Sequence, residues 1–166
     1  MRKCVFAFAL VFFAFAISAC VLVAHGPSDN AADAQYVQSI QTVVDSNEAI
    51  AFMDKGYFVA NAAKPGPTQT WGASGTIVVT DKTLYFLFWN RHASTFDVIR
   101  KLPIADIANI DHISSIFNPV DSLSIEDKNH RFDVFSCQLM FSKDNQNLVE
   151  KNRKLMNCLN EIRNAK

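Results

Sequence analysis

A serine between small residues is the first candidate for covalent chemistry in this chain. Ser74 lies in Gly72-Ala73-Ser74-Gly75, whereas the nucleophile elbow of hydrolases needs Gly-x-Ser-x-Gly on a turn from a strand into a helix. The segment here leads into the β-branched run Thr76–Thr80, so we interpret it as the flexible start of a strand. No catalytic nucleophile is expected.

Charged side chains show no spacing typical of acid–base catalysis. Arg100 and Lys101 precede Pro103 and are expected on a solvated strand end. Most aspartates of the second half are expected on turns or on the wet face of a sheet: Asp97, Asp106, Asp111, Asp121, Asp127 and Asp133. We expect a protein without enzymatic activity and without catalytic residues.

Histidines and cysteines form no metal-binding pattern. There is no Cys-x-x-Cys pair, no Cys/His ligand spacing, and no histidine pair spaced as ligands on one helix among His25, His92, His112 and His130. Neither a metal nor another cofactor is therefore expected. Cys137 and Cys158 are predicted not to form a disulfide, because Cys158 lies about 20 Å along the predicted final helix.

The N-terminus has the pattern of a secretory signal. Arg2 and Lys3 precede an apolar run, and a basic start followed by an apolar stretch and small residues is typical of export signals. Moving the two positive charges across a bilayer is costly. This end is therefore expected to stay in the cytoplasm while the remaining chain is exported.

The end of this run, Ile17-Ser18-Ala19-Cys20, resembles the lipobox of bacterial lipoproteins, in which an aliphatic residue and two small residues precede an obligatory cysteine. The resemblance implies that the Cys20 thiol receives a diacylglyceryl group and that a peptidase cuts between Ala19 and Cys20. Val21 follows. In the enterobacterial sorting pattern an Asp at this position retains the protein at the inner membrane, so its absence favours the outer membrane if the organism has one.

An uncleaved membrane anchor is the alternative for the same segment. Residues 4–24 form a stretch of 21 residues in which Ser18 is the only plainly polar side chain. About 20 apolar residues are long enough to span a bilayer as a helix. Both interpretations place the rest of the chain outside the cytoplasm, facing the periplasm or the cell exterior.

The remaining chain has the size and charge of one nearly neutral domain. Removal of residues 1–19, which contain Arg2 and Lys3, leaves 147 of 166 residues, with 14 basic and 16 acidic side chains. That length is sufficient for an independent hydrophobic core. Nucleic-acid binding depends on clustered Lys and Arg, so no nucleic-acid partner is expected, and membrane affinity is attributed to acylation.

Four segments are predicted: a signal peptide (1–19), a lipidated tether (20–34), an amphipathic helix (35–47) and a folded domain (48–166). Asn30 or Asp33 is expected to cap the helix. Its apolar stripe follows helical spacing and comprises Tyr36, Val37, Ile40, Val43 and Val44.

After residue 48 the pattern changes to short β-rich stretches. Two apolar stretches, 48–53 and 57–60, are expected on either side of a turn at Asp54-Lys55-Gly56. Hairpin turns are expected at Asp81-Lys82 and Asp127-Lys128-Asn129. The remaining strands are expected at 76–80, 84–89, 96–102, 107–113, 122–126 and 131–136, and a closing helix, whose apolar stripe Asn152 interrupts, at 145–164.

Two segments resemble GRAM and bacterial pleckstrin-homology-like domains. Trp71–Phe86 has the Trp, Gly, β-rich strand and Thr-Asp-Lys turn of their opening hairpin, and Lys101–Ile110 has their Pro-aliphatic pair before Asp-Ile. The resemblance covers roughly residues 48–164. It implies an α+β fold, in which a seven-stranded, partly open antiparallel barrel is capped by a C-terminal helix. The side chains expected to fill the barrel are Phe86, Phe88, Leu102, Ile110, Leu123, Ile125, Phe132 and Val134.

The loop that carries basic residues in phosphoinositide-binding members of this superfold is poor in charge here. Residues 61–72 contain Lys64 as their one basic residue, and Arg91 lies on the next loop. Phosphoinositide binding is therefore not expected for this chain. Lys64 and Arg91 are the candidate ligand-binding residues for an unknown ligand.

The function expected from these features is that of a membrane-tethered, non-enzymatic binding or scaffolding module of the bacterial cell envelope. Its partners would be the membrane, through the acylated N-terminus, and another envelope protein or a lipid. A carrier of lipid or a small ligand inside the barrel is the alternative, although the many Phe residues favour a packed interior. An envelope hydrolase is a third hypothesis.

The replacement Cys20→Ala tests the lipoprotein hypothesis. We expect loss of lipid labelling and accumulation of an uncleaved precursor, because the modified thiol is what permits cleavage. Metabolic labelling with a clickable fatty acid and N-terminal mass spectrometry measure both effects. A variant that matures to the same N-terminus and stays membrane-bound without acyl chains would contradict the hypothesis.

Overall fold

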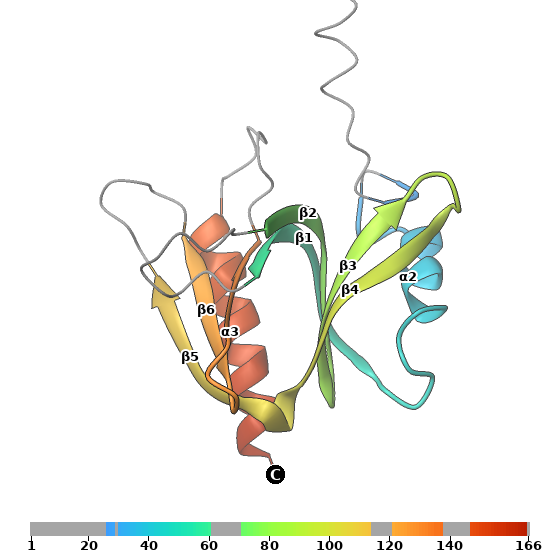
Figure 1. Cartoon of the computed structure of the whole chain (residues 1–166). Helices are drawn as coiled ribbons and strands as arrows, with labels where there is room; N and C mark the ends of the chain where they lie inside the picture. The colour runs from blue at the N-terminus through green and yellow to red at the C-terminus, as the bar shows by residue number, and fades with distance from the viewer. Residues whose placement is uncertain (1–25, 29, 61–70, 114–120, 138–146, 166) are drawn as a thin grey trace, which may run out of the picture.

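Seven antiparallel strands form one strongly bent sheet with the order β4-β3-β2-β1-β7-β6-β5 (Figure 1). The computed structural model describes residues 26–28, 30–60, 71–113, 121–137 and 147–165. The elements, in chain order, are α2 (Ala34–Gln41), β1 (Ile50–Ala60), β2 (Trp71–Thr80), β3 (Thr83–Asn90), β4 (Thr95–Pro103), the 3-10 turn η1 (Ile104–Asp106), β5 (Ile107–Ile113), β6 (Ser122–Asp127), β7 (Phe132–Ser136) and α3 (Leu148–Asn164).

This arrangement confirms the expected fold class, a partly open antiparallel barrel capped by a C-terminal helix. The two halves of the sheet diverge on either side of β1, and α3 lies across the space between them (Figure 1). Within the described part of the chain, no helix is long and apolar enough to cross a membrane.

The long strand β1 corrects one sequence-based expectation, because it runs unbroken through the predicted turn at Asp54-Lys55-Gly56. Its whole length pairs with β2 and its last four residues also pair with β7, so it belongs to both halves of the sheet. A Cβ atom on Gly56 would lie 2.4 Å from the backbone oxygen of Ser136. Glycine here therefore marks a close approach of two strands, not a turn.

The barrel interior is filled by apolar side chains from both halves of the sheet and from α3. Phe58 stacks on Phe86 and packs at a tilt against Phe135, with ring centroids 5.0 Å apart in both pairs. Leu155 and Leu159 of α3 are fully buried in the same cluster. The described part of the interior is therefore a packed core.

Half of the expected interior is confirmed and half is not. Phe86, Leu102, Leu123 and Ile125 are buried in this core. Ile110 is only partly buried against it, and Phe88 is 39% exposed near the end of β3. In β7 the interior residues are Asp133 and Phe135, and the expected Phe132 and Val134 are half-buried. The predicted register of β7 was thus wrong by one residue, which exchanges the two faces of a strand.

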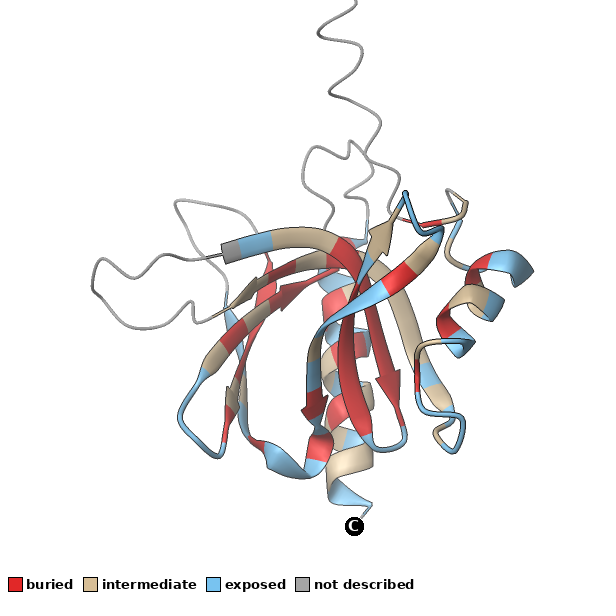
Figure 2. Ribbon diagram, turned by 45° about the vertical axis from the view of Figure 1, so that its right-hand side comes forward, coloured by how far each residue is buried: buried red, intermediate tan, exposed pale blue. Residues whose placement is uncertain are grey.

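A second apolar layer lies between α2 and the outer face of β2, β3 and β4. Tyr36 and Ile40 of α2 are fully buried against Val78 and Leu87. Their side of the helix faces the sheet (Figure 2). Strand β3 is consequently buried on both faces over its first five residues.

Helix α2 ends earlier than the predicted helix 35–47. Thr42 follows its last residue, and its hydroxyl donates to the backbone oxygen of Ser39. Neither of the expected caps bonds to the helix through its side chain. Asp33 is the N-cap residue but makes no side-chain cap bond, and the Asn30 side chain accepts the N–H of Ala32, which precedes the helix. Residues 42–49 therefore continue as a short connection to β1.

Two phenylalanines on one strand provide a matched test of the interior. Phe86→Ala should lower the free energy of unfolding by about 3–5 kcal/mol, because it leaves a cavity in a packed core. Phe88→Ala removes the same atoms from a partly exposed site and should cost a small fraction of that. Chemical denaturation of both variants gives the two values. Equal losses would contradict the burial pattern of β3.

Candidate functional site

A groove lies between α2, the connection that follows it and the first residues of β1. Its volume is about 620 Å³, which is within the range of sites for small ligands or a few side chains of a peptide. The residues that line it are Val37, Gln41, Val44, Asp45, Ser46, Glu48, Ala49, Ile50 and Met53. Both an apolar surface and carboxylates are thus present in one concave site.

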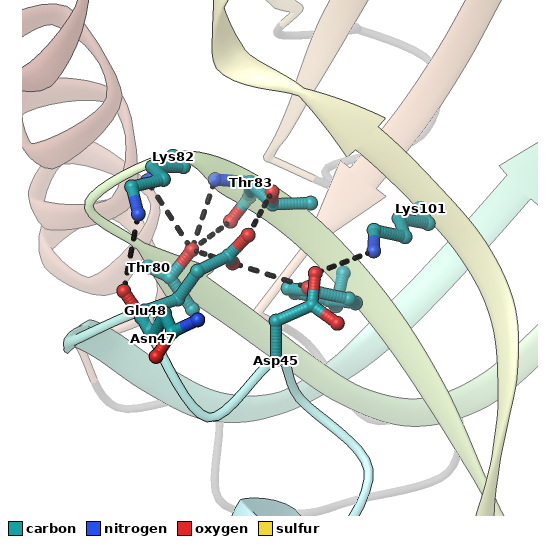
Figure 3. A network of polar contacts seen from close by, with 8 residues as sticks. Asp45, Asn47, Glu48, Thr80, Lys82, Thr83 and Lys101 are labelled. Atoms are coloured by element: carbon teal, nitrogen blue, oxygen red, sulfur yellow. Dashed lines mark hydrogen bonds and ion pairs between the residues drawn. The ribbon is translucent and has the colours of Figure 1, made fainter.

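The Glu48 carboxylate at the groove is held by three hydroxyl groups. It accepts bonds from Thr80 Oγ1 at 2.6 Å, Thr83 Oγ1 at 3.0 Å and Tyr85 Oη at 3.1 Å. Thr80 Oγ1 also accepts the N–H of Thr83 across the hairpin turn, at 2.9 Å. The turn between β2 and β3 therefore presents an ordered set of hydroxyl donors to one carboxylate (Figure 3).

Tyr85 remains a hydroxyl donor at physiological pH. Burial raises the pKa of this phenol, and the adjacent Glu48 carboxylate raises it further, since both disfavour the phenolate. A neutral phenol can donate only one hydrogen bond, and here Glu48 receives it. This bond ties the connection after α2 to β3, next to the edge strand β4.

Further contacts fix the same connection from both sides. Ala49 and Asp81 are joined by two bonds of 2.9 Å, from the Ala49 N–H to Asp81 Oδ1 and from the Asp81 N–H to the Ala49 oxygen. Lys82 Nζ donates to the Asn47 backbone oxygen at 3.1 Å. These bonds make the wall of the groove a preorganised surface, which lowers the entropic cost of binding.

Asp45 is the most accessible charge at the groove. Its carboxylate pairs with Lys101 Nζ at 2.8 Å, and this cation holds the pKa of Asp45 below its usual range. Both side chains are about half exposed, so the pair contributes little to stability. The carboxylate can therefore exchange Lys101 for a cation of a bound partner at low cost.

The other end of α2 is fixed by Tyr36. Its hydroxyl and Thr76 Oγ1 are 2.5 Å apart in a buried hydrogen bond, and burial raises the pKa of Tyr36 to about 12. Gly26 packs directly on the ring, where a Cβ atom would lie 2.0 Å from a ring carbon. Lys55 Nζ donates to the Ser28 oxygen at 3.0 Å and lies 5.4 Å from the centre of the same ring. The chain is therefore docked on the domain from Gly26 onward.

An ionic cluster built on two buried carboxylates corrects the expectation for Arg100. This side chain is not on a solvated edge: it points into the barrel, where Nε lies 2.6 Å from Asp133 and Nη2 lies 3.5 Å from Asp127. Arg131 also binds Asp127, at 2.6 Å. Asp121, Asp127 and Asp133 are buried, contrary to the expected wet positions, whereas Asp97, Asp106 and Asp111 are exposed as expected.

A second buried polar cluster explains why Asn152 interrupts the stripe of α3. Its amide accepts the N–H of Cys137 at 2.8 Å and donates to the backbone oxygen of Asp121 at 2.7 Å, which joins the helix to the sheet. His112 pairs with the buried Asp121 carboxylate. The hydroxyl of Ser136 donates to the same Asp121 oxygen at 2.7 Å.

The sequence-based site residues are distributed as follows. Arg91 is exposed in the turn between β3 and β4, whereas Ala19, Cys20 and Lys64 lie outside the described residues. Ser74 sits in β2 opposite Tyr57, as expected for a strand. In the described ranges, no group of three or more His, Cys, Asp or Glu side chains could hold a metal ion.

Cys137 and Cys158, the cysteines of the described ranges, are free thiols, as predicted. Cys137 is buried next to β7, and burial raises its pKa to about 12. Cys158 packs against the same core from α3. Thiols with raised pKa values are weak nucleophiles, so both serve as small apolar side chains.

Sequence reasoning missed the groove. The Thr80 and Thr83 pair was recognised only as the flanks of a turn, and the signal overlooked was their need for a hydrogen-bond partner, which Glu48 supplies from a distant segment. Asp45 and Glu48 were read as the end of a helix and the start of a strand. The two residues are local neighbours, and the Glu48 N–H donates to the Asp45 backbone oxygen at 3.0 Å. Their long-range partners, the β2–β3 hydroxyl groups for Glu48 and Lys101 for Asp45, are what a local pattern does not show.

No protein-family model matches the chain, and no curated protein matches it. Among solved structures, the chain is similar to the N-terminal PH domain of Vps36, with 17% identity, a TM-score of 0.43 and coverage of 71% of this chain and 86% of that one. It is also similar to the C-terminal domain of an unknown protein from Leishmania infantum, with 12% identity, a TM-score of 0.45 and coverage of 75% of this chain and 94% of that one. A third similar structure is the hSac2 domain of the human phosphoinositide phosphatase Sac2, with 10% identity, a TM-score of 0.49 and coverage of 79% of this chain and 80% of that one. The fold assignment rests on the strand order and closing helix of this chain itself.

The ionic cluster predicts a specific acid sensitivity. Burial alone would raise the pKa of Asp127, but bonds from Arg131 and two backbone N–H groups lower it from 3.8 to about 2. A lowered carboxylate pKa stabilises the fold above pH 4, and this contribution is lost as the pH falls toward 2. Asp127→Asn should therefore be less stable than the natural chain at pH 7, with the difference shrinking between pH 4 and pH 2.

Urea denaturation across this pH range measures the difference, and Asp106→Asn is the control. Asp106 is half exposed, and its Oδ1 lies 3.6 Å from Lys128, so this change should have little effect at any pH. A constant difference between Asp127→Asn and the natural chain from pH 7 to pH 2 would contradict the assignment.

Proposed function

We propose that this protein is a lipid-anchored, non-enzymatic binding module of the bacterial cell envelope, and that the groove beside α2 holds a segment of a partner protein. The observation that carries the proposal is the groove itself, in which the Glu48 carboxylate is fixed in place by the hydroxyl groups of the β2–β3 turn and the Asp45 carboxylate stays accessible. Preorganised concave sites of mixed polarity are typical of binding surfaces.

The chemistry of the groove suggests the partner. Val44, Ile50 and Met53 offer apolar contact, while Asp45 and Glu48 add negative charge. A segment with an aliphatic residue next to Lys or Arg complements both features. Asp45 already accepts one ammonium group, that of Lys101, which supports recognition of a second cation at this position.

Lipid anchoring is supported by the lipobox-like segment Ile17-Ser18-Ala19-Cys20. Diacylglyceryl on Cys20 plus a further acyl chain exceeds the single-chain threshold for stable membrane attachment. The module would then face the periplasm or the cell exterior, with the outer membrane favoured in an organism that has one.

A carrier function inside the barrel is less well supported. The interior volume that a carried lipid would need is taken by the stacked rings of Phe58, Phe86 and Phe135 in the described part of the barrel. The groove lies on the opposite side of the first half of the sheet, next to α2. We therefore place the binding function there.

Titration of the isotope-labelled chain from Val21 onward tests the groove. We expect a short peptide of sequence Lys-Leu-Val-Lys to shift the amide resonances of Ser46, Ala49 and Ile50, and the matched peptide Glu-Leu-Val-Glu to leave them unchanged. NMR spectroscopy gives both results residue by residue. Binding should weaken with salt, since charge attraction contributes to it.

Two variants in which a tryptophan replaces an alanine provide the control. Ala49→Trp fills the groove and should abolish the shifts, whereas Ala108→Trp introduces the same ring at an exposed position of β5 and should not. Shifts of equal size with both peptides, or shifts that survive Ala49→Trp, would contradict the proposed site.

A further inference from the structure

The docked N-terminal segment limits how far the domain can lie from its anchor. This inference rests on the proposed acylation of Cys20. Gly26 is buried against Tyr36, so only residues 20–25 separate the lipid from the folded domain. Even fully extended, these residues span at most about 22 Å. One end of the domain must therefore face the bilayer at close range.

Strand register shows which features lie on either side of the docking point. Tyr36 bonds to Thr76, which pairs with Lys55 of β1 and with Leu87 of β3. From Leu87, β3 reaches its last residue, Asn90, in about 10 Å. In the opposite direction, β1 runs from Lys55 to Ile50 at the groove, about 16 Å away.

Figure 1 shows the same polarity. The start of the described chain lies beside the β3–β4 turn. Helix α2 leads away from that turn, and the connection to β1, which forms the groove wall, lies at the far end of the helix.

The two ends differ in chemistry. The turn end exposes Arg91 and His92 and, below them, part of the Phe88 ring. The groove end carries the carboxylates of Asp45 and Glu48. Cations are attracted to a bilayer that contains anionic lipids, and carboxylates are repelled. Asp97 is also exposed beside the turn, however, and Lys101 pairs with Asp45 at the groove, so the charge difference between the two ends is small. The short link is what brings the β3–β4 end toward the membrane.

The outward side of α2 offers no competing membrane surface. Its exposed residues are Ala34, Gln35, Gln38 and Gln41, which include no large apolar and no charged side chain. A helix that lies on a membrane needs large apolar side chains on one face and basic residues beside them. Contact of the outward side of α2 with the bilayer would therefore contribute little binding free energy.

We infer that the short docked link orients the domain on the membrane, with the β3–β4 turn toward the bilayer and the groove away from it. The groove then opens about 25 Å beyond the turn, into the aqueous compartment. Its partner is accordingly a protein segment that approaches from solution. The anchor would thus determine the direction in which the binding site faces, in addition to the localisation of the protein.

Energy transfer to the membrane surface tests this orientation on the full-length chain. An azidophenylalanine replaces either Ala93, in the β3–β4 turn, or Ser46, at the groove, and carries a fluorophore. The purified lipoprotein is placed in phosphatidylethanolamine–phosphatidylglycerol vesicles with an acceptor on the lipid head groups. Transfer should be much stronger from position 93 than from position 46. Equal transfer, or stronger transfer from position 46, would overturn the inference.

A longer link provides the matched control. Insertion of about 20 Gly and Ser residues between positions 24 and 25 adds an average reach of about 25 Å, so the difference between the two labels should largely disappear. A difference that stays unchanged would mean that the link does not set the orientation, which also overturns the inference.

A second attachment separates this inference from the proposed acylation. Mass spectrometry of the N-terminal peptide first shows whether Cys20 carries lipid. The chain from Val21 onward, with a hexahistidine tag in place of the preceding residues, is then bound to vesicles that contain a nickel-chelating lipid. If Cys20 carries no lipid but the tagged chain shows strong transfer from position 93, acylation fails while the orientation holds. Equal transfer in the tagged chain refutes the orientation by itself.

Discussion

The docking of Tyr36 against the outer face of the sheet is the interaction on which the functional features depend. Its ring is fully buried, its hydroxyl bonds to Thr76 across 40 residues of chain, and Gly26 and Lys55 pack on the ring. Loss of this contact would release α2, and the groove beside α2 would lose one wall. The same contact fixes the point at which the chain leaves the domain toward its proposed anchor.

The two sides of the first half-sheet therefore serve different purposes. The inner side, with Phe58 and Phe86, closes a packed barrel, and the half-buried Arg100 and the buried Asp133 add a specific ion pair within it. Buried ion pairs add little net stability compared with apolar residues of the same volume, but the loss of one partner is costly. The outer side, packed against α2, forms the groove that we propose as the partner-binding site.

Much of the fold follows from local sequence patterns. The β2–β3 hairpin was predicted because Asp81-Lys82 separates two β-rich runs, and the closing helix because Leu155 and Leu159 share one stripe. Long-range effects account for the failures. Gly56 has the local pattern of a turn residue, and only the close approach of β7 explains why glycine is needed there. The interior position of Phe135 depends on the pairing of β7 with β6, which no local pattern specifies.

The groove lies beyond local prediction for the same reason. Asp45 and Glu48 have ordinary neighbours in the sequence, and the partners that fix them come from far along the chain: the hydroxyl groups of the β2–β3 turn for Glu48 and Lys101 for Asp45. In the same way, the burial of Asp127 and Asp133 depends on Arg100 reaching across the barrel. A charged residue that looks solvated in the sequence can thus be a structural partner in the fold.

Photo-crosslinking in living cells tests the central claim, a partner-binding groove that faces away from the membrane, most directly. A benzophenone amino acid placed at Ser46 should yield a discrete protein adduct that disappears in the Ala49→Trp background and persists with Ala108→Trp. The same probe at Ala93 should yield lipid adducts instead. Identical protein adducts from both positions, or an adduct at Ser46 that survives Ala49→Trp, would contradict the account.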